Sequence, residues 1–359
     1  MDIDRPLERI LDLARWAPSG DNTQPWRFEI RGAQHAVVNG FDTRDHCVYD
    51  LDGRPSQIAL GALLETAAIA ATAEGWVMRA VRRADVADST PTFDLHFTAD
   101  AGISLDPLIT AIRTRSVQRG FMATRPLSQV EKMALAASVG TDFDVEWIEG
   151  WRGRRRMAGL LFQSARLRLV MPEAYAVHRD VIEWNARFSN DRVPDRALGV
   201  DRATLWLMRF AMKSWKRVQF LNRFMAGTWI PRMQMDFLPA IACAGHFVLI
   251  ARTIPETIDD WIRAGRAIQR FWLTVTRLNL VMQPEVTPLI FSRYVSSGIH
   301  FSDTPGMFEM AISVAAKVRA TIGNRGATHC VFMGRLGAGP ESRSRSLRRE
   351  IPDLMTVRI

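Results

Sequence analysis

A loop near the N-terminus combines short polar side chains with two prolines. Residues 17–26 read Ala-Pro-Ser-Gly-Asp-Asn-Thr-Gln-Pro-Trp. Prolines restrict the backbone and small residues leave its amides accessible, so such a loop can hydrogen-bond the heteroatom edge of a flat heterocycle. The same composition is typical of a plain turn between a helix and a strand. The candidate binding residues here are Pro18, Ser19, Gly20, Asn22 and Gln24.

Two arginine-rich segments farther along the chain could hold a phosphate group. The first places Arg115, Ser116 and Arg119 close to the end of an expected helix. The second places Arg343 and Arg345 two positions apart, so on an extended segment both side chains point to the same side. Guanidinium groups bind phosphate oxygens through paired hydrogen bonds. Each segment alone is equally typical of a solvated basic run or tail.

The elements that would position these residues follow an alternating plan. In the first part, apolar periodicity and turn residues predict a helix over residues 7–16, strands at 27–31 and 36–38, a helix at 55–74, and strands at 76–82 and 92–98. The pattern then starts again, with helices at 106–114 and 128–137, a strand at 143–148, a helix at 153–169, a strand at 238–251, helices at 258–280 and 304–321, and a strand at 328–333.

An internal repeat links the two parts. When residues 57–78 are placed over residues 261–282, Gly61 meets Gly265, and four further positions are identical. Glycine inside a helix costs about 1 kcal/mol relative to alanine, so a glycine in the middle of both helices indicates a close helix contact. We therefore expect two half-domains whose central helices pack face to face.

Taken together, these segments resemble the FMN-dependent nitroreductase family. Residues 17–26 match its Ala-Pro-Ser-x-x-Asn-x-Gln-Pro-Trp loop, residues 115–119 are similar to its Arg-Arg-Ser-x-Arg phosphate element, and Arg343 with Arg345 is similar to its terminal Lys-x-Arg clamp. The resemblance covers most of the chain except residues 172–237. It implies an α/β (α+β) fold of the nitroreductase type, a three-layer α-β-α sandwich present here as two half-domains, with FMN bound between them.

The order of the motifs departs from the usual one. In family members two subunits build each site, one giving the phosphate element and the other the Ala-Pro-Ser loop. Here residues 1–105 carry the loop and residues 106–359 carry the arginines, while the second counterpart of the loop, residues 137–142, lacks the Asn and the Gln-Pro-Trp. The chain thus resembles a fused pseudo-dimer of the Acg-type branch, with one composite FMN site per chain, either as a monomer or as a homodimer.

The resemblance also implies the chemistry. Backbone amides of Glu285 and Val286 would face the flavin N5, although the glycine usual after the glutamate is absent. No side-chain acid or base is required, since the cofactor carries the reaction. The implied activity is electron transfer from NAD(P)H to an organic acceptor. Two alternatives stay open: an FMN-storing protein with little turnover, and a flavin dehydrogenase acting on a biosynthetic intermediate.

Composition narrows the class of protein. Hydrophobic residues make up 47% of the 359 residues, which is enough for a sizeable core, and the net charge is +9. Three widely spaced cysteines and a charged N-terminus predict a reducing, cytoplasmic location without a signal peptide. The spacing of histidines, cysteines and carboxylates indicates no metal site, and no nucleic-acid motif is present.

The segment 172–237 is rich in Trp, Met, Phe and Arg. Residues 205–225 can be drawn as one amphipathic helix with a basic face. Three interpretations are open: a core helix, a lid over the flavin, or a helix lying on an anionic membrane. We expect core and lid in preference to membrane contact.

Overall fold

Two four-stranded antiparallel sheets of the same topology form the framework of the computed structural model, which describes residues 5–224 and 227–356. The first sheet has the order β1-β2-β4-β3, built from Trp26–Gly32, His35–Gly40, Thr92–Ala99 and Trp76–Arg82. The second, read from its β5 edge, has the order β5-β9-β11-β10, built from Phe143–Glu149, Gly245–Ala251, Cys330–Ala338 and Leu280–Pro284. Each strand of the first sheet thus has a counterpart in the second, in the same chain order.

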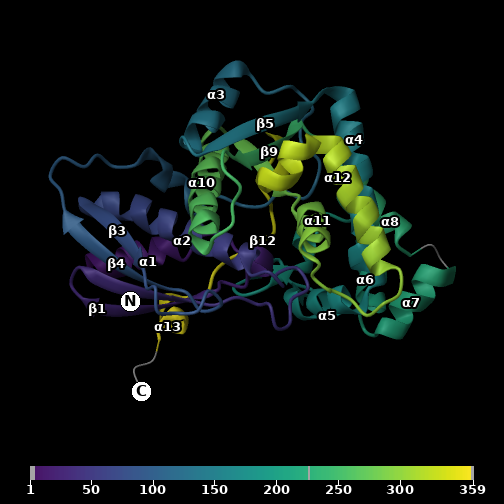
Figure 1. The fold of residues 1–359 in the computed structure, drawn as a ribbon, viewed down its shortest axis with the longest axis horizontal. Helices are drawn as coiled ribbons and strands as arrows, with labels where there is room; N and C mark the ends of the chain where they lie inside the picture. Colours follow the sequence, from purple (N-terminus) through teal and green to yellow (C-terminus); the bar gives the residue numbers. More distant parts are fainter. Residues whose placement is uncertain (1–4, 225–226, 357–359) are drawn as a thin grey trace.

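The central helices α2 (Arg54–Ala71) and α10 (Ile258–Arg277) meet in the middle of the molecule (Figure 1). The contact is at the predicted glycines: a Cβ on Gly61 would lie 2.1 Å from the Ile262 carbonyl oxygen, and one on Gly265 would lie 2.1 Å from that of Ile58. The two helices therefore touch backbone to backbone, and the contact is reciprocal. The sequence prediction of two paired central helices is confirmed.

The second sheet is the middle layer of an α-β-α sandwich. All residues of β9 are buried, and they alternate between two cores. Phe247 and Leu249 pack with residues of α10 and α3 (Gln129–Ser138), whereas Val248 and Ile250 pack with residues of α4 (Gly150–Val170) and α12 (Met307–His329). The predicted three-layer arrangement of helices and sheet is present in this half. In the first half, α1 (Pro6–Ala14) and α2 cover one face of the sheet.

A long helical excursion leaves the second half between β5 and β9, at the place where β1 and β2 are joined by a short turn. It starts with α4 and contains the predicted segment 172–237. Its further elements are α5 (Pro172–Val181), β6 (Ile182–Glu183), β7 (Phe188–Ser189), β8 (Val193–Pro194), α6 (Arg202–Ala211), α7 (Trp215–Phe224), α8 (Trp229–Arg232), a π-helix (Met233–Phe237) and α9 (Leu238–Ile241).

The C-terminal segment returns to the first half. After α11 (Thr287–Ser297), α12 and β11, the chain forms β12 (Arg345–Ser346) and α13 (Ile351–Leu354). The Thr356 amide donates to the Phe28 carbonyl at 2.8 Å, and α13 lies beneath the first sheet in Figure 1. Residues from the end of the chain are thereby brought to the N-terminal loop.

Four element predictions were wrong in detail. Residues 107–111 form a 3-10 turn rather than a helix over 106–114, and residues 238–241 form α9 before the strand begins at Gly245. The single helix predicted over 205–225 is two helices, α6 and α7, because the chain turns at Ser214, whose amide bonds to Ala211; Met225 lies outside the described residues. The helix predicted over 258–280 ends at Arg277, and strand β10 (Leu280–Pro284) was not predicted.

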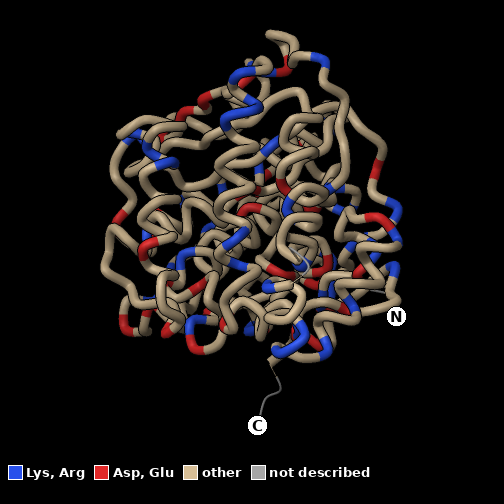
Figure 2. The backbone as a smooth tube through the Cα atoms, turned by 90° about the vertical axis from the view of Figure 1, so that its right-hand side faces the viewer, with Lys and Arg blue, Asp and Glu red and all other residues tan. Residues whose placement is uncertain are grey.

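The basic surplus is spread over the molecule. Figure 2 shows Lys and Arg positions interspersed with Asp and Glu along the whole backbone, rather than gathered in one block. Within the described residues, one helical stretch, residues 54–74, is long and apolar enough to cross a membrane; its apolar window is 78% buried inside the molecule, as expected of a core helix.

Candidate functional site

A composite cavity of about 270 Å³ lies where the two halves meet. The N-terminal loop and α2 form one side, and α10, residues 115–119 and the start of α11 form the other. We call this the composite cavity; its lining includes Pro18, Ser19, Gly20, Asp21, Asn22, Ala59, Ala62, Arg115, Ser116, Arg119, Trp272, Gln283, Val286, Arg345 and Arg348. Residues from both 1–105 and 106–359 thus line this cavity.

The loop itself is held in an unusual conformation. Asp21, Asn22 and Gln24 adopt positive φ angles of 49°, 63° and 52°. Non-glycine residues with positive φ are uncommon and cost free energy unless surrounding contacts fix them, so their clustering favours a functional loop. Ser19 contributes one such contact, since its Oγ accepts from the Gln24 amide at 3.0 Å.

Three arginines that line the cavity, Arg115, Arg345 and Arg348, form no ion pair with a carboxylate among the described residues. Arg115 donates to the Trp16 carbonyl and stacks on Trp272 at 4.6 Å, and the Nη2 of Arg345 donates to the Arg113 carbonyl. Arg348 donates to the Ala17 carbonyl at 2.9 Å and to the Asn22 Oδ1 at 2.9 Å. Their hydrogen-bond acceptors are all neutral, so the three positive charges are not compensated by an ion pair among the described residues.

The pKa values of these arginines also reflect an excess of positive charge. Burial, together with the charges of Arg348 and Arg345, holds the pKa of Arg115 well below its usual range. Burial, with Arg345 and Arg15 nearby, lowers the pKa of Arg348 to about 9. The Nε atoms of Arg115 and Arg345 are buried and have no hydrogen-bond partner. A buried cationic cluster with spare donors is suited to a dianion such as a phosphate monoester.

The predicted phosphate residues are brought together only in part. Arg115, Ser116 and Arg345 line the cavity. Arg343 is exposed and does not line it, and its carbonyl accepts from Arg187 instead. Arg348 occupies the place expected for Arg343. The run of arginines over residues 343–349 was the signal that could have pointed to Arg348. The prediction instead assumed one extended strand through Arg343 and Arg345, whereas β12 ends at Ser346.

Arg119 also lines the cavity, but its neighbours differ from those of the other three arginines. It donates to the Ala197 carbonyl at 3.1 Å, and its pKa is lowered to about 10 by burial, opposed by the charge of Asp21 and reinforced by Arg335 and Arg168. Its partners are thus Asp21 and the helical excursion.

Of the two loop amides, Asn22 reaches the cavity and Gln24 does not. The Gln24 side chain is fully buried, donates to the Asn190 carbonyl at 2.9 Å and accepts from the Arg349 amide at 2.9 Å. It ties the loop to the excursion and to the C-terminal segment. Its role in this structure is to position Asn22 and Arg348.

Of the two residues predicted to face the flavin N5, Val286 lines the cavity and Glu285 does not. The Glu285 amide donates to the Met333 carbonyl at 2.9 Å, and its carboxylate pairs with His246 at 2.7 Å and with Arg335 at 3.1 Å. Burial opposes ionisation, but these two cations lower the pKa of Glu285. Val286 lines the cavity and caps the N-terminus of α11. The helix α11 therefore presents its positive end to the cavity, a position that favours electron-rich groups.

The helical excursion closes one side of the cavity. Val193 and Ala197 are part of the lining, the Asn22 side chain donates to the Arg192 carbonyl at 3.2 Å, and β7 pairs with β12. Residues of the excursion thus form one wall of the cavity, although none of residues 205–225 lines it.

The chemistry of the donor set fits FMN. The uncompensated arginines match the phosphate, and the alanines of α2 leave a flat apolar floor at Ala59 and Ala62. The Oε1 of Gln283 is buried without a donor, so it is available to a flavin N–H or a ribityl hydroxyl. Phosphate, chain and ring thus each have a suitable partner.

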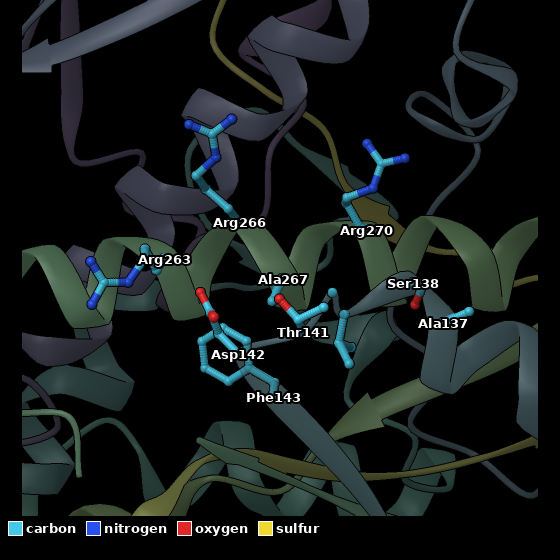
Figure 3. A pocket seen from close by; sticks show the side chains of 11 residues that line it. Ala137, Ser138, Thr141, Asp142, Phe143, Arg263, Arg266, Ala267 and Arg270 are labelled. Atoms are coloured by element: carbon cyan, nitrogen blue, oxygen red, sulfur yellow. The ribbon is translucent and has the colours of Figure 1, made fainter. Parts of the chain in front are cut away.

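A second groove occupies the corresponding place in the other half. It is formed by residues 137–143, the counterpart of the N-terminal loop, and by Arg263, Arg266, Ala267 and Arg270 of α10 (Figure 3). The side chains of Arg266 and Arg270 point away from the loop segment with Thr141 and Asp142. Arg266 pairs with Glu65 at 2.8 Å, and Arg270 pairs with Glu65 at 2.9 Å and with Asp106 at 3.0 Å. These charges are already neutralised.

Comparison with known proteins gives one curated relative and several solved structures. No family model matches the chain. The uncharacterized protein MT1398 of Mycobacterium tuberculosis is 24% identical over 294 residues, which span 80% of this chain but 39% of that protein. Among solved structures, a nitroreductase-like family protein from Bacillus cereus covers 72% of this chain at 11% identity with a TM-score of 0.35. An FMN-dependent nitroreductase from Mycobacterium smegmatis, in complex with NADPH, covers 69% at 14% identity with a TM-score of 0.36.

Proposed function

We propose that this chain binds one FMN in the composite cavity and works as a nitroreductase-type oxidoreductase, transferring electrons from NAD(P)H to a small organic acceptor. Residues 1–105 and 106–359 act as the two halves of a pseudo-dimer, so a monomer contains a complete site. The observation that carries the proposal is the cluster of Arg115, Arg345 and Arg348: Arg115 and Arg348 are buried, Arg345 is half-buried, and none of the three forms an ion pair among the described residues.

In this proposal each group has a defined task. Arg115, Ser116, Arg345 and Arg348 hold the phosphate, and the loop residues Pro18, Ser19, Gly20 and Asn22 hold the ribityl chain and the ring edge. Bound FMN supplies hydride and electron transfer at its ring. Val286 and the first turn of α11 stabilise negative charge that develops there. The excursion excludes water from the cavity and bounds the space left for a substrate.

A storage role is the second candidate, and one observation favours it. The Glu285 amide is engaged with Met333, so fewer backbone donors remain for the flavin N5 than the family pattern implies. Reduced flavin would then be stabilised less, and turnover would be slow. The two roles share the same binding site and differ in the rate of reduction.

The test is an absorption spectrum of the purified protein, quantified per chain and followed during anaerobic addition of NADH or NADPH. One FMN per chain that bleaches supports the oxidoreductase. One FMN that stays oxidised favours storage. Two FMN per chain would contradict the composite site, and no flavin after reconstitution would contradict the proposal as a whole.

A further inference from the structure

The helices α6 and α7 of the excursion expose aromatic side chains that a core or a lid would bury. Trp206 is 70% exposed, Phe210 is 42% exposed, Phe220 is 56% exposed and Phe224 is 66% exposed. These four residues therefore lie outside the core, whereas Leu207, Met208 and Leu221 on the other face are half-buried or buried. In Figure 1 the two helices lie at one end of the molecule, on its right-hand side, away from both sheets.

The aromatic residues fall on one face of each helix, together with cations. On α6 the exposed positions include Arg202, Trp206 and Phe210, and this line continues into Lys213. On α7 they are Lys216, Phe220, Arg223 and Phe224. These eight residues are called the aromatic-basic face. A solvated helix face is normally polar throughout, so alternation of large rings with cations indicates a partner with both an apolar and an anionic layer.

The rings are paired within each helix. Trp206 and Phe210 stack with centroids 6.3 Å apart, and Phe220 and Phe224 lie 5.1 Å apart. Arg217 of α7 lies over the Phe210 ring at 4.4 Å, which links the two helices. The rings therefore form two contacting pairs on adjacent helices rather than a set of isolated side chains.

The charge of the segment has one sign. From residue 202 to residue 235 the sequence contains no Asp or Glu, whereas it contains Arg202, Arg209, Lys213, Lys216, Arg217, Arg223 and Arg232. Among the described residues no carboxylate pairs with Lys213, Lys216 or Arg223. Elsewhere in the molecule, carboxylates such as Glu65 and Asp144 each pair with two arginines. The electrostatic attraction of this face for an anionic surface is therefore not screened from within the chain.

We propose that the aromatic-basic face docks the protein onto an anionic lipid bilayer. The rings enter the boundary between headgroups and acyl chains, and the cations contact lipid phosphates, which is how interfacial amphipathic helices bind. A second copy of the chain is a poorer partner, because a symmetric contact would bring the same cations together. Docking at this end leaves the sheets and the composite cavity outside the bilayer.

The experiment is co-sedimentation of the full-length, FMN-loaded protein with vesicles. Vesicles of phosphatidylcholine with phosphatidylglycerol are compared with vesicles of phosphatidylcholine alone. We expect binding to the former, weakened by added salt, and little binding to the latter. The double variants Trp206→Ser/Phe210→Ser and Phe220→Ser/Phe224→Ser should each weaken binding by about tenfold or more. Lys213→Gln/Lys216→Gln should weaken it by about tenfold as well.

The matched control is Phe121→Ser, which removes a ring that is 60% exposed outside the excursion. It should bind vesicles as the unaltered protein does, and all variants should keep their FMN, which shows that they are folded. Equal binding by the face variants and the unaltered protein would overturn the proposal. So would a dimer in sedimentation velocity that only the face variants dissociate, or binding of a single-stranded oligonucleotide in place of vesicles.

Discussion

The composite cavity and the second groove occupy corresponding places in two halves of the same topology, and they differ in two respects. In the cavity, α2 contributes Ala59 and Ala62 as a floor. At the positions 204 residues later, α10 contributes Arg263 and Arg266 to the groove. The cavity also contains buried arginines without carboxylates, whereas the groove's arginines are paired with Asp260, Glu65 and Asp106.

This difference indicates that the shared framework does not by itself make a binding site. A guanidinium that is buried and unpaired keeps its affinity for an anion, whereas one that is paired with a carboxylate has little left to offer. The duplicated framework therefore provides two corresponding grooves, and only the one whose arginines lack carboxylate partners is suited to bind an anion.

The largest effect is expected from removing the unpaired arginines. Arg115→Ala/Arg348→Ala should weaken FMN binding roughly 10²- to 10⁴-fold, because each hydrogen bond to a charged group contributes about 1.5–3 kcal/mol. Titration of the apoprotein, followed by flavin fluorescence, measures this. Riboflavin, which lacks the phosphate, should bind both proteins with similar affinity.

Two variants are controls for this comparison. Arg266→Ala/Arg270→Ala in the second groove and Arg343→Ala on the exposed side of the C-terminal segment should each leave FMN affinity within about threefold of the unaltered protein. A loss of FMN in Arg343→Ala equal to that in the double variant would restore the original sequence assignment. An altered FMN stoichiometry in Arg266→Ala/Arg270→Ala would show that the groove binds flavin.

The next largest effect is expected on stability, from changing the contact between α2 and α10 at Gly61. Gly61→Ala should lower the free energy of unfolding by about 3 kcal/mol, because its Cβ would lie 2.1 Å from the Ile262 carbonyl and the helices would have to separate. Denaturant unfolding measures this. Gly159→Ala on α4 is the matched control: its nearest atom would be the flexible Lys317 Nζ at 3.3 Å, so the change should stay within about 1 kcal/mol.

A smaller effect is expected from pH. The folded apoprotein releases the Arg348 proton more easily than the unfolded chain, since its pKa is lowered to about 9. Apoprotein stability should therefore rise as pH increases through about 9, while FMN affinity falls by up to about tenfold per pH unit in the same range. Riboflavin has no phosphate to bind Arg348, so its affinity should not show this fall with pH. Parallel loss of FMN and riboflavin above pH 9 would show that the phosphate cluster is not involved.

The sequence predicted the framework better than the site. Hydrophobic periodicity and paired glycines were sufficient for the strands of both sheets other than β10, and for the contact at Gly61 and Gly265, because these features depend on local pattern and close packing. Arg348 was missed because its position depends on how the C-terminal segment crosses to the first half. The engagement of the Glu285 amide was missed because strand pairing with β11 is a long-range contact. Neither contact leaves a periodic trace in the sequence.

The smallest expected effect tests whether the ion pairs of its arginines are what prevents the second groove from binding an anion. Glu65→Gln removes the carboxylate that pairs with Arg266 and one of the two that pair with Arg270, which keeps Asp106. Because those arginines are each 38% exposed, we expect a loss of stability of only about 1 kcal/mol. Asp144→Asn, which breaks an exposed pair with Arg252 and Arg325, is the control and should have almost no effect. The freed arginines should then attract anions, so sulfate should raise the melting temperature of Glu65→Gln more than that of the unaltered protein or of Asp144→Asn. Equal increments in all three would show that the shape of the groove, rather than its neutralised charge, prevents anion binding there.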